Sequence, residues 1–411
     1  MRIAVCDYSG HPFQVELSRS LAARGHDALH LHFAAFQTPK GNLQVMPEDP
    51  PGFRVEGIGA DITFDKTQFL RRRFIEAHVG RLFARRAAQF AADVVIGCNM
   101  PLDAQKQLHR LCRRRRVPFI FWLQDIYSHA IDHYLSARLG RPGRLIGGYY
   151  RHLEAGLLRT SDMVVAISDK FVPALEAWRI GRDRIRVIPN WAPLSEVYPV
   201  AKHNAWARQH GLASKTVALY TGTLGLKHDP ALLVETAQAA GAVGLELVVV
   251  SEGAAVDWLK QQKRERRIDN LTLLPFQPME AYPEVLGSGD ILLAMIEAQA
   301  ATFSVPSKIL SYLAAGKPII ASIGAENDAA ATIAAAGAGM VTQPGDRRAF
   351  ADAVLALAAD PDRRASLGYN ARAYAERSFD VEAITDRFEA IFSAIHPRVA
   401  PLHGVAVPGP A

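Results

Sequence analysis

A loop, a helix and a strand follow one another in the stretch SVPSKILSYLAAGKPIIA, residues 304–321. Ser307 and Lys308 stand where the helix should begin, and the free N–H groups and the dipole of a helix start favour an anion. Gly316 should end the helix, and the apolar residues after Pro318 predict a buried parallel strand. The stretch therefore predicts an α/β domain with a phosphate-binding turn.

The alternation of strands and helices continues on both sides of this stretch. In the second half we expect strands at residues 217–220, 246–250, 272–274, 291–294 and 319–321. In the first half we expect them at residues 2–5, 27–33, 93–97, 117–122, 163–167 and 186–188. The expected helices cover residues 14–24, 66–92, 103–114, 145–160, 230–240, 256–266, 279–286, 308–315, 349–359 and 364–379. Such alternation requires crossover connections with helices on both faces of a parallel sheet. The sequence predicts two Rossmann-like, doubly wound α/β domains that face a ligand cleft.

The length of 411 residues is long for one domain and suits two of ordinary size. We expect an N-terminal domain over residues 1–195, a linker over 196–215 and a C-terminal domain over 216–380. A last helix over residues 381–396 follows, and the tail over 397–411 is rich in Pro and Gly and is expected to be flexible.

The composition excludes several classes of protein. No run of about eighteen apolar residues is free of polar breaks, so no membrane-spanning helix is expected. The N-terminus enters a strand at once without the layout of a signal peptide, which indicates a cytoplasmic protein. The cysteines, Cys6, Cys98 and Cys112, are too scattered for a disulfide framework or a zinc site, and we expect small buried residues.

A second candidate phosphate loop, TGTLGLK, follows the strand at residues 217–220. Gly222 and Gly225 would let the backbone approach a diphosphate, and Lys227 supplies a positive charge. The Gly-Lys-Ser/Thr ending of a Walker loop is absent. A Gly-x-x-Gly turn alone is more often structural, but its place after a strand of the same domain favours a functional role.

In the first half, the loop YSGHPFQ, residues 8–14, joins the first strand to the first helix. Gly10 permits a close approach of the backbone to a ligand, and the turn should face the cleft. A dinucleotide fingerprint needs three glycines in this loop, and only Gly10 is present. The loop therefore argues against an NAD-dependent enzyme.

Asp125 stands at the end of another strand of the first half. Its carboxylate either orients or deprotonates an acceptor hydroxyl, or it caps the turn that follows. His129 and His133 have a helical spacing that would suit a metal, but no third ligand is evident in the sequence. We expect no metal site here.

Basic residues are concentrated in the first third, although the net charge is only +6. One run contains Arg71, Arg72 and Arg73 among apolar residues, as in an amphipathic helix that lies on anionic lipid or grips an acidic acceptor. A second run covers residues 110–116. A solvated helix face is the alternative for each run, and the sequence leaves the choice open. No nucleic-acid-binding motif accompanies the charge, so no nucleic acid partner is expected.

The Pro-Ser-Lys loop and its Ala-Ala-Gly-Lys-Pro ending resemble the nucleotide-sugar-binding segment of glycosyltransferase family 4. These retaining enzymes have two Rossmann-like domains, the GT-B fold. The resemblance implies that a nucleotide-diphosphate sugar is the co-substrate, that no cofactor or metal is needed, and that the last helix crosses back to the first domain. Two glutamates that are widespread in the family would fall on Phe303 and Ser311, so donor contacts should shift toward the Ser/Lys loop.

The residues and the resemblance together assign the site. Asp125, Lys227 and Lys308 are the expected catalytic residues. The expected donor-binding residues are Gly10, Gly222, Thr223, Gly225, Ser251, Glu252, Phe276, Ser304, Pro306, Ser307 and Ser311. Contacts with the acceptor or a membrane are expected from His11, Gln14, Arg71, Arg72 and Arg73.

These parts predict a retaining, hexosyltransferase-type glycosyltransferase that acts on a lipid-linked glycan in cell-surface polysaccharide synthesis. Attack on the leaving-group face needs no enzyme nucleophile, and no carboxylate pair like that of retaining hydrolases is evident. The expected partners are the donor, a glycan or glycolipid acceptor, and an anionic membrane on whose inner face the protein would lie. A nucleotide-sugar epimerase of the same fold would turn over the donor alone. A non-catalytic, membrane-bound sugar-binding protein would be indifferent to Lys308→Ala.

Overall fold

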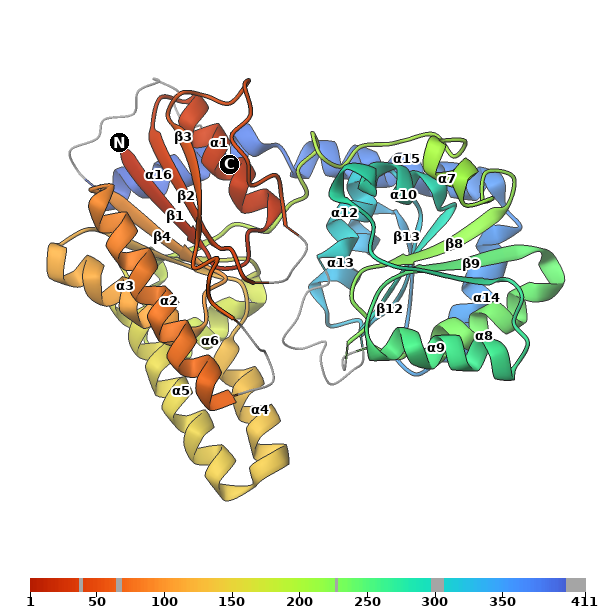
Figure 1. The fold of residues 1–411 in the computed structure, drawn as a ribbon, viewed down its shortest axis with the longest axis horizontal. Helices are drawn as coiled ribbons and strands as arrows, with labels where there is room; N and C mark the ends of the chain where they lie inside the picture. The colour runs from red at the N-terminus through yellow and green to blue at the C-terminus, as the bar shows by residue number, and fades with distance from the viewer. Residues whose placement is uncertain (37–39, 64–68, 226–227, 297–306, 397–411) are drawn as a thin grey trace. The chain divides into compact units, whose positions relative to one another are not determined.

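The computed structural model describes residues 1–36, 40–63, 69–225, 228–296 and 307–396. These residues form two compact units (Figure 1). The first unit contains Met1–Pro189 and the chain from Val381 onward, and the second contains Asn190–Asp380. Each unit is built around one parallel sheet, so the prediction of two Rossmann-like α/β domains is confirmed.

The first sheet has seven strands in the order β3-β2-β1-β4-β5-β6-β7. The strands are β1 (Arg2–Asp7), β2 (Asp27–Phe33), β3 (Phe53–Ile58), β4 (Val94–Cys98), β5 (Phe119–Leu123), β6 (Met163–Ala166) and β7 (Ile185–Val187). The sequence did not predict β3. It is an edge strand that pairs with β2 and follows a Pro-rich loop. Arg54, Glu56 and Gly57 interrupt its apolar residues, so no continuous apolar run marks it in the sequence.

Helices cover this sheet. They are α1 (Pro12–Ala23), α2 (Phe69–Gln89), α3 (Leu102–Arg115), α4 (Tyr127–Leu139), α5 (Arg141–Thr160), α6 (Val172–Ala177) and α16 (Val381–Ile395). The last of these packs against α1, where Arg24 forms ion pairs with Glu382 at 2.8 Å and Glu389 at 2.7 Å. The ring of Phe388 lies 4.9 Å from that of the fully buried Trp122. The last helix therefore completes the first unit.

The second sheet has six strands in the order β10-β9-β8-β11-β12-β13. The strands are β8 (Thr216–Thr221), β9 (Leu245–Val250), β10 (Leu271–Leu274), β11 (Ile291–Met295), β12 (Ile319–Ser322) and β13 (Gly339–Thr342). The helices are α7 (Ala205–Gln209), α8 (Ala231–Ala240), α9 (Ala254–Glu265), α10 (Tyr282–Ser288), α12 (Lys308–Ala314), α13 (Asp328–Ala336), α14 (Arg347–Ala358) and α15 (Pro361–Ser378). Both α13 and β13 were absent from the sequence-based assignment.

The segment expected as a linker, residues 196–215, packs into the second unit. The side-chain amide of Asn204 donates to the carbonyl of Glu284 at 2.9 Å and to the hydroxyl of Ser288 at 3.2 Å. Trp206 is buried, and its indole N–H donates to Gln277 at 2.9 Å. Since these contacts tie the segment to α10, the second unit begins near Asn190 and contains no separate linker.

The strand order gives each sheet one topological switch point. It lies between β1 and β4 in the first sheet and between β8 and β11 in the second, because the winding direction reverses there. Loops at the carboxyl ends of these strands diverge and leave room for a ligand. Within the described residues no helix is long and apolar enough to cross a membrane.

Candidate functional site

The two loops that were expected to hold a diphosphate meet at the switch point of the second sheet. Gly222 directly follows β8, and Lys308 begins α12 beside β11. Gly222 has a φ of +106°, and a Cβ built on it would lie 3.4 Å from Nζ of Lys308. Glycine is therefore favoured here for two reasons: its φ is positive, and a side chain would contact the Lys308 ammonium group.

Lys308 lies on an aromatic surface. Its Nζ is 3.7 Å from the centroid of the Tyr220 ring, which is a cation–π contact, and it is shielded from solvent. Burial raises the pKa of Tyr220 well above its usual value, and its hydroxyl donates to the carbonyl of Thr223 at 3.1 Å. The lysine charge is thus held by a neutral ring at the end of β8.

Tyrosine hydroxyls connect β8, α10 and α12 beneath this lysine. Tyr312 donates to the carbonyl of Leu293 at 3.1 Å and accepts from the backbone N–H of Thr221 at 3.3 Å. The hydroxyl of Tyr282 hydrogen-bonds to the side chains of Thr221 and Ser311. Ser311 was expected to contact the donor, but here it supports Tyr282. These tyrosines were not predicted as site residues, because each stands among apolar residues and looks like an ordinary core side chain.

The start of α12 is less fully described. Ser307 is exposed and is the first residue before α12, and its side chain makes no capping hydrogen bond. Ser304, Pro306 and Lys227 lie outside the described residues. Gly316 follows the helix with a φ of +65°, as expected for a glycine that ends a helix.

The loop after Gly222 is held by its own residues. The N–H of Gly225 donates to Nδ1 of His228 at 3.0 Å. At the start of α8, the N–H of Ala231 donates to the Asp229 carboxylate at 3.2 Å, and Arg347 pairs with that carboxylate at 2.7 Å. Because Asp229 already occupies the helix start, the space for an anion in this loop lies nearer Gly222 and Gly225.

Glu252 and Phe276 lie side by side at the carboxyl ends of β9 and β10. The backbone N–H of Phe276 donates to the Glu252 carboxylate at 3.2 Å. The Phe276 side chain is 43% exposed, which makes it available to stack on a planar group. Ser251 is buried between them, and its N–H donates to the carbonyl of Leu274 at 3.0 Å.

In the first unit, a buried carboxylate organises the loop after β1. Asp7 is fully buried and accepts hydrogen bonds from the backbone N–H groups of Ser9 at 2.9 Å and His11 at 2.6 Å. When the Gln14 amide is oriented so that its oxygen and its nitrogen both have hydrogen-bond partners, its nitrogen donates to the two Asp7 oxygens at 2.7 and 2.9 Å. Gln14 was expected to contact an acceptor, but it is fully buried and is committed to Asp7.

Two further features of this loop follow from its packing. Gly10 has a φ of +77°, and a Cβ on it would lie 2.9 Å from Leu43. Burial raises the pKa of Asp7 to about 7, while the surrounding N–H donors lower it. Asp7 was missed in the sequence because an acid at the end of an apolar strand resembles an ordinary turn residue.

The N-terminus of α4, which follows Asp125, donates hydrogen bonds to a buried acid on another helix. Glu154 on α5 is fully buried and accepts from the N–H groups of Tyr127 at 3.0 Å and Ser128 at 2.9 Å, the first residues of α4. Burial raises the pKa of Glu154 to about 7, and the nearby Asp125 charge adds to the rise. Glu154 therefore caps the start of α4, and Asp125 lies half-buried just after the end of β5.

The arginine run on α2 is largely paired within the unit. Arg72 forms an ion pair with Glu76 at 2.6 Å, and Arg73 forms one with the buried Asp103 at 3.1 Å. Arg73 also lies over the Tyr149 ring, 5.1 Å from its centroid. Of the arginines expected at the membrane, Arg71 and Arg73 are exposed and Arg72 is partly exposed; Arg72 and Arg73 are also paired with acidic side chains.

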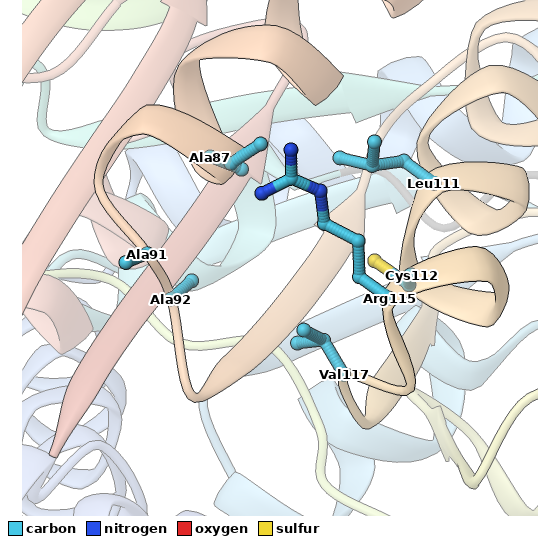
Figure 2. A pocket seen from close by; sticks show the side chains of 8 residues that line it. Ala87, Ala91, Ala92, Leu111, Cys112, Arg115 and Val117 are labelled. Atoms are coloured by element: carbon cyan, nitrogen blue, oxygen red, sulfur yellow. The ribbon is translucent and has the colours of Figure 1, made fainter.

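A small hollow lies between the ends of α2 and α3 (Figure 2). It has a volume of about 40 Å³ and is lined mainly by alanines with Leu111, Cys112, Arg115 and Val117. Ala92 and Val117 precede β4 and β5, so the hollow is at the amino edge of the sheet, opposite the switch point. Ligand pockets are usually several hundred Å³, so this hollow is too small for a nucleotide sugar. Among the described residues there is also no cluster of metal-ligating side chains.

Comparison with known families agrees with this arrangement. Residues 11–191 match the family described as "Glycosyl transferase 4-like domain", and residues 203–374 match "Glycosyl transferases group 1". The chain belongs to the glycosyltransferases of the family 4 type. The resemblance inferred from the Ala-Ala-Gly-Lys-Pro segment is thereby confirmed at the level of the family.

The individual relatives named here share a quarter or less of their residues with this chain. The colanic acid biosynthesis glycosyl transferase WcaI of Escherichia coli K12 is 25% identical over 242 residues, which cover 57% of this chain and 58% of the relative. Sucrose-phosphate synthase from Thermosynechococcus elongatus has a TM-score of 0.73 at 17% identity, over 97% of this chain and 100% of that one. Anabaena HepE, solved with UDP-glucose, has a TM-score of 0.69 at 18% identity, over 96% and 100%. The solved structures establish the shared fold.

Proposed function

We propose that this glycosyltransferase moves a hexosyl group from a nucleotide-diphosphate sugar to a hydroxyl of a lipid-linked glycan, with retention of configuration. The observation that carries the proposal is the juxtaposition of Gly222 and Lys308 at the switch point of the second sheet. A relative named for colanic acid biosynthesis supports a polysaccharide product, and HepE with UDP-glucose supports a nucleotide-sugar donor.

On the donor side, the leaving diphosphate gains negative charge as the glycosidic bond breaks. Lys308 would stabilise that charge from its position on the Tyr220 ring, together with backbone N–H groups near Gly222. A low-dielectric setting strengthens this interaction, and the shielded Nζ has such a setting. Lys227 would add a second positive charge, so the reaction would need neither a metal nor a resident cofactor.

On the acceptor side, Asp125 at the end of β5 would orient the attacking hydroxyl and accept its proton. The His11 loop, fixed by the Asp7 carboxylate, would contact the acceptor glycan. The hydroxyl oxygen would form the new bond to the anomeric carbon on the face from which the diphosphate departs. In this route no covalent sugar-enzyme intermediate forms.

The test is transfer with a panel of UDP-, GDP- and ADP-sugars and a membrane lipid extract as the acceptor source. We expect one donor to give a glycolipid whose new linkage keeps the donor's anomeric configuration, as read by NMR coupling constants. The rate should be the same with and without a chelator.

Three outcomes would overturn parts of the proposal. Conversion of the donor to an isomer without any acceptor would indicate an epimerase. An inverted linkage would refute the retaining route, and loss of activity with chelator would refute metal independence. If no donor binds and none is transferred, the glycosyltransferase proposal for these substrates fails.

A further inference from the structure

The helices α4 and α5 form an antiparallel hairpin that extends past the first sheet (Figure 1). Gly140 joins them with a φ of +61°. Residues 133–153, which include the turn, contain four arginines and neither Asp nor Glu. The whole chain has 41 acidic and 47 basic residues, so this stretch is more basic than the chain as a whole.

The inner side of the hairpin is closely packed. A Cβ built on Gly143 would lie 2.0 Å from the carbonyl oxygen of Leu135, and one on Gly147 would lie 2.1 Å from Oδ1 of Asp132. Leu135 itself is buried. The two glycines therefore allow α4 and α5 to pack in direct contact, and the side chains on the other faces of the hairpin remain exposed.

That outer surface carries large apolar side chains. Leu145 is 79% exposed, Tyr134 52%, Leu139 48% and Tyr149 40%. Leu145 and Tyr149 are one helical turn apart on α5, with Arg141 one turn before them, so the three share a face. In soluble proteins such a gathering marks an interaction site.

Cations surround these apolar groups near the turn. Arg138, Arg141 and Arg144 are exposed, and within the described part of the chain Arg141 and Arg144 have no ion pair. Arg138 donates to the hydroxyl of Tyr134 at 2.9 Å. We define the hairpin surface as Tyr134, Arg138, Leu139, Arg141, Arg144 and Leu145.

We propose that the hairpin surface docks on an anionic lipid bilayer, with Leu139 and Leu145 entering the headgroup region. Arginines and tyrosines at this depth can contact lipid phosphates while their apolar parts remain among acyl chains. A second copy of the chain would oppose the same arginines to one another, so charge disfavours self-association through this surface. A functional role for this docking rests on the proposed function, because the enzyme and its lipid-linked acceptor would then lie on the same membrane.

This assignment differs from the sequence-based one. The arginines of α2 were expected to lie on the membrane, but Arg72 and Arg73 are paired with Glu76 and Asp103. The hairpin was not expected, since α4 was absent from the sequence-based assignment. Its surface combines exposed apolar groups with arginines in one place.

The experiment is co-sedimentation of the full chain with vesicles, without donor or acceptor. Vesicles of phosphatidylcholine alone are compared with vesicles that also contain phosphatidylglycerol. The variant Arg138→Gln/Arg141→Gln/Arg144→Gln should bind the anionic vesicles roughly 100-fold more weakly, from about fivefold for each arginine. Leu145→Glu should weaken binding by a similar factor.

The matched control removes the same charge from α3, as Arg113→Gln/Arg114→Gln/Arg115→Gln, where all three side chains are exposed. It should retain wild-type binding apart from a small general charge effect. Equal losses in the two triple variants would overturn the proposal in favour of net charge. Failure of the wild type to bind anionic vesicles would also overturn it.

Self-association is a separate outcome. A dimer in sedimentation equilibrium that Leu145→Glu dissociates would assign the surface to a second copy and overturn the lipid proposal. Thermal melting of each variant shows that the unit is folded. Vesicle binding with no glycosyl transfer would contradict the proposed function and leave the docking surface intact, so the two failures are distinguishable.

Discussion

The two sheets share one strand order, apart from the extra edge strand β7, but the carboxyl ends of their central strands carry different charged side chains. In the first unit the strand ends present acids, with Asp7 buried beneath the loop and Asp125 at the end of β5. In the second unit the corresponding place holds Lys308 on the ring of Tyr220. The same topology thus creates two sites of opposite chemistry.

Under the proposed function, this difference would divide one fold between two substrates. A cation suits a leaving diphosphate, and a carboxylate suits a hydroxyl that must lose a proton. The strand order only places ligands near these strand ends, whereas the side chains decide which ligand each end accepts. Changes at the two ends should therefore have different consequences for catalysis and stability.

Lys308→Ala should give the largest effect. We expect kcat to fall about 10²- to 10³-fold, as on removal of one preorganised group that stabilises transition-state charge. The free energy of unfolding should fall by no more than about 2 kcal/mol, from loss of the cation–π contact with Tyr220. Steady-state kinetics and urea denaturation measure the two quantities.

Lys260→Ala is the control for Lys308→Ala, because Lys260 is 58% exposed on α9 and pairs with an exposed Asp257. It should leave kcat unchanged. Equal kcat in wild type and Lys308→Ala would break the comparison, because the cation of the second switch point would then be structural.

Asp7→Ala should act mainly on stability. The substitution leaves the N–H groups of Ser9 and His11 and the Gln14 amide without their buried acceptor. We expect a loss of about 3 kcal/mol in unfolding free energy, as for other buried polar groups that lose a charged partner. Urea denaturation measures it, and Asp257→Ala, at a side chain that is 75% exposed, should cost almost nothing. A loss below about 1 kcal/mol would contradict the organising role of Asp7.

The pH dependence of stability should separate Asp7→Asn from the wild type. The pKa of Asp7 rises from 3.8 to about 7 on folding, so the folded state binds the proton more tightly. Between about pH 4 and pH 7 the wild type should therefore lose stability relative to Asp7→Asn as the pH rises. The pKa of Glu154 is shifted in the same direction, while those of His30 and His32 are lowered and act oppositely. The contribution of Asp7 is therefore the difference in unfolding free energy between the wild type and Asp7→Asn at each pH. If that difference is constant from pH 4 to pH 7, the raised pKa of Asp7 is contradicted.

The sequence predicted the two sheets because their strands are apolar runs between turn residues. It missed β3, whose exposed edge breaks the apolar pattern, and α13, whose alanines carry little periodic signal. It placed a linker at residues 196–215, because polarity alone does not reveal the contacts of Asn204 and Trp206. Local patterns therefore gave the architecture but not the docking of short segments.

For the site, the sequence identified Gly222 and Lys308 from loop chemistry, and the structure brings these two together. It could not identify Tyr220, Tyr282 and Tyr312, since their partners come from different parts of the sheet. It also assigned Gln14 to a ligand, because burial against Asp7 is a tertiary fact. Residues that act through long-range contacts were beyond the reach of sequence motifs.

Ser311→Ala should give the smallest effect, and it tests where the donor site ends. The Ser311 side chain hydrogen-bonds to Tyr282, so its loss should cost about 1 kcal/mol of unfolding free energy. The KM for the donor should stay within about twofold of the wild type, because the hydroxyl is used inside the unit; donor titration in steady-state kinetics measures it. A tenfold rise in KM without a change in stability would instead place Ser311 among the donor contacts, where a carboxylate stands in other family members. The cationic switch point would then extend one helical turn along α12 from Lys308.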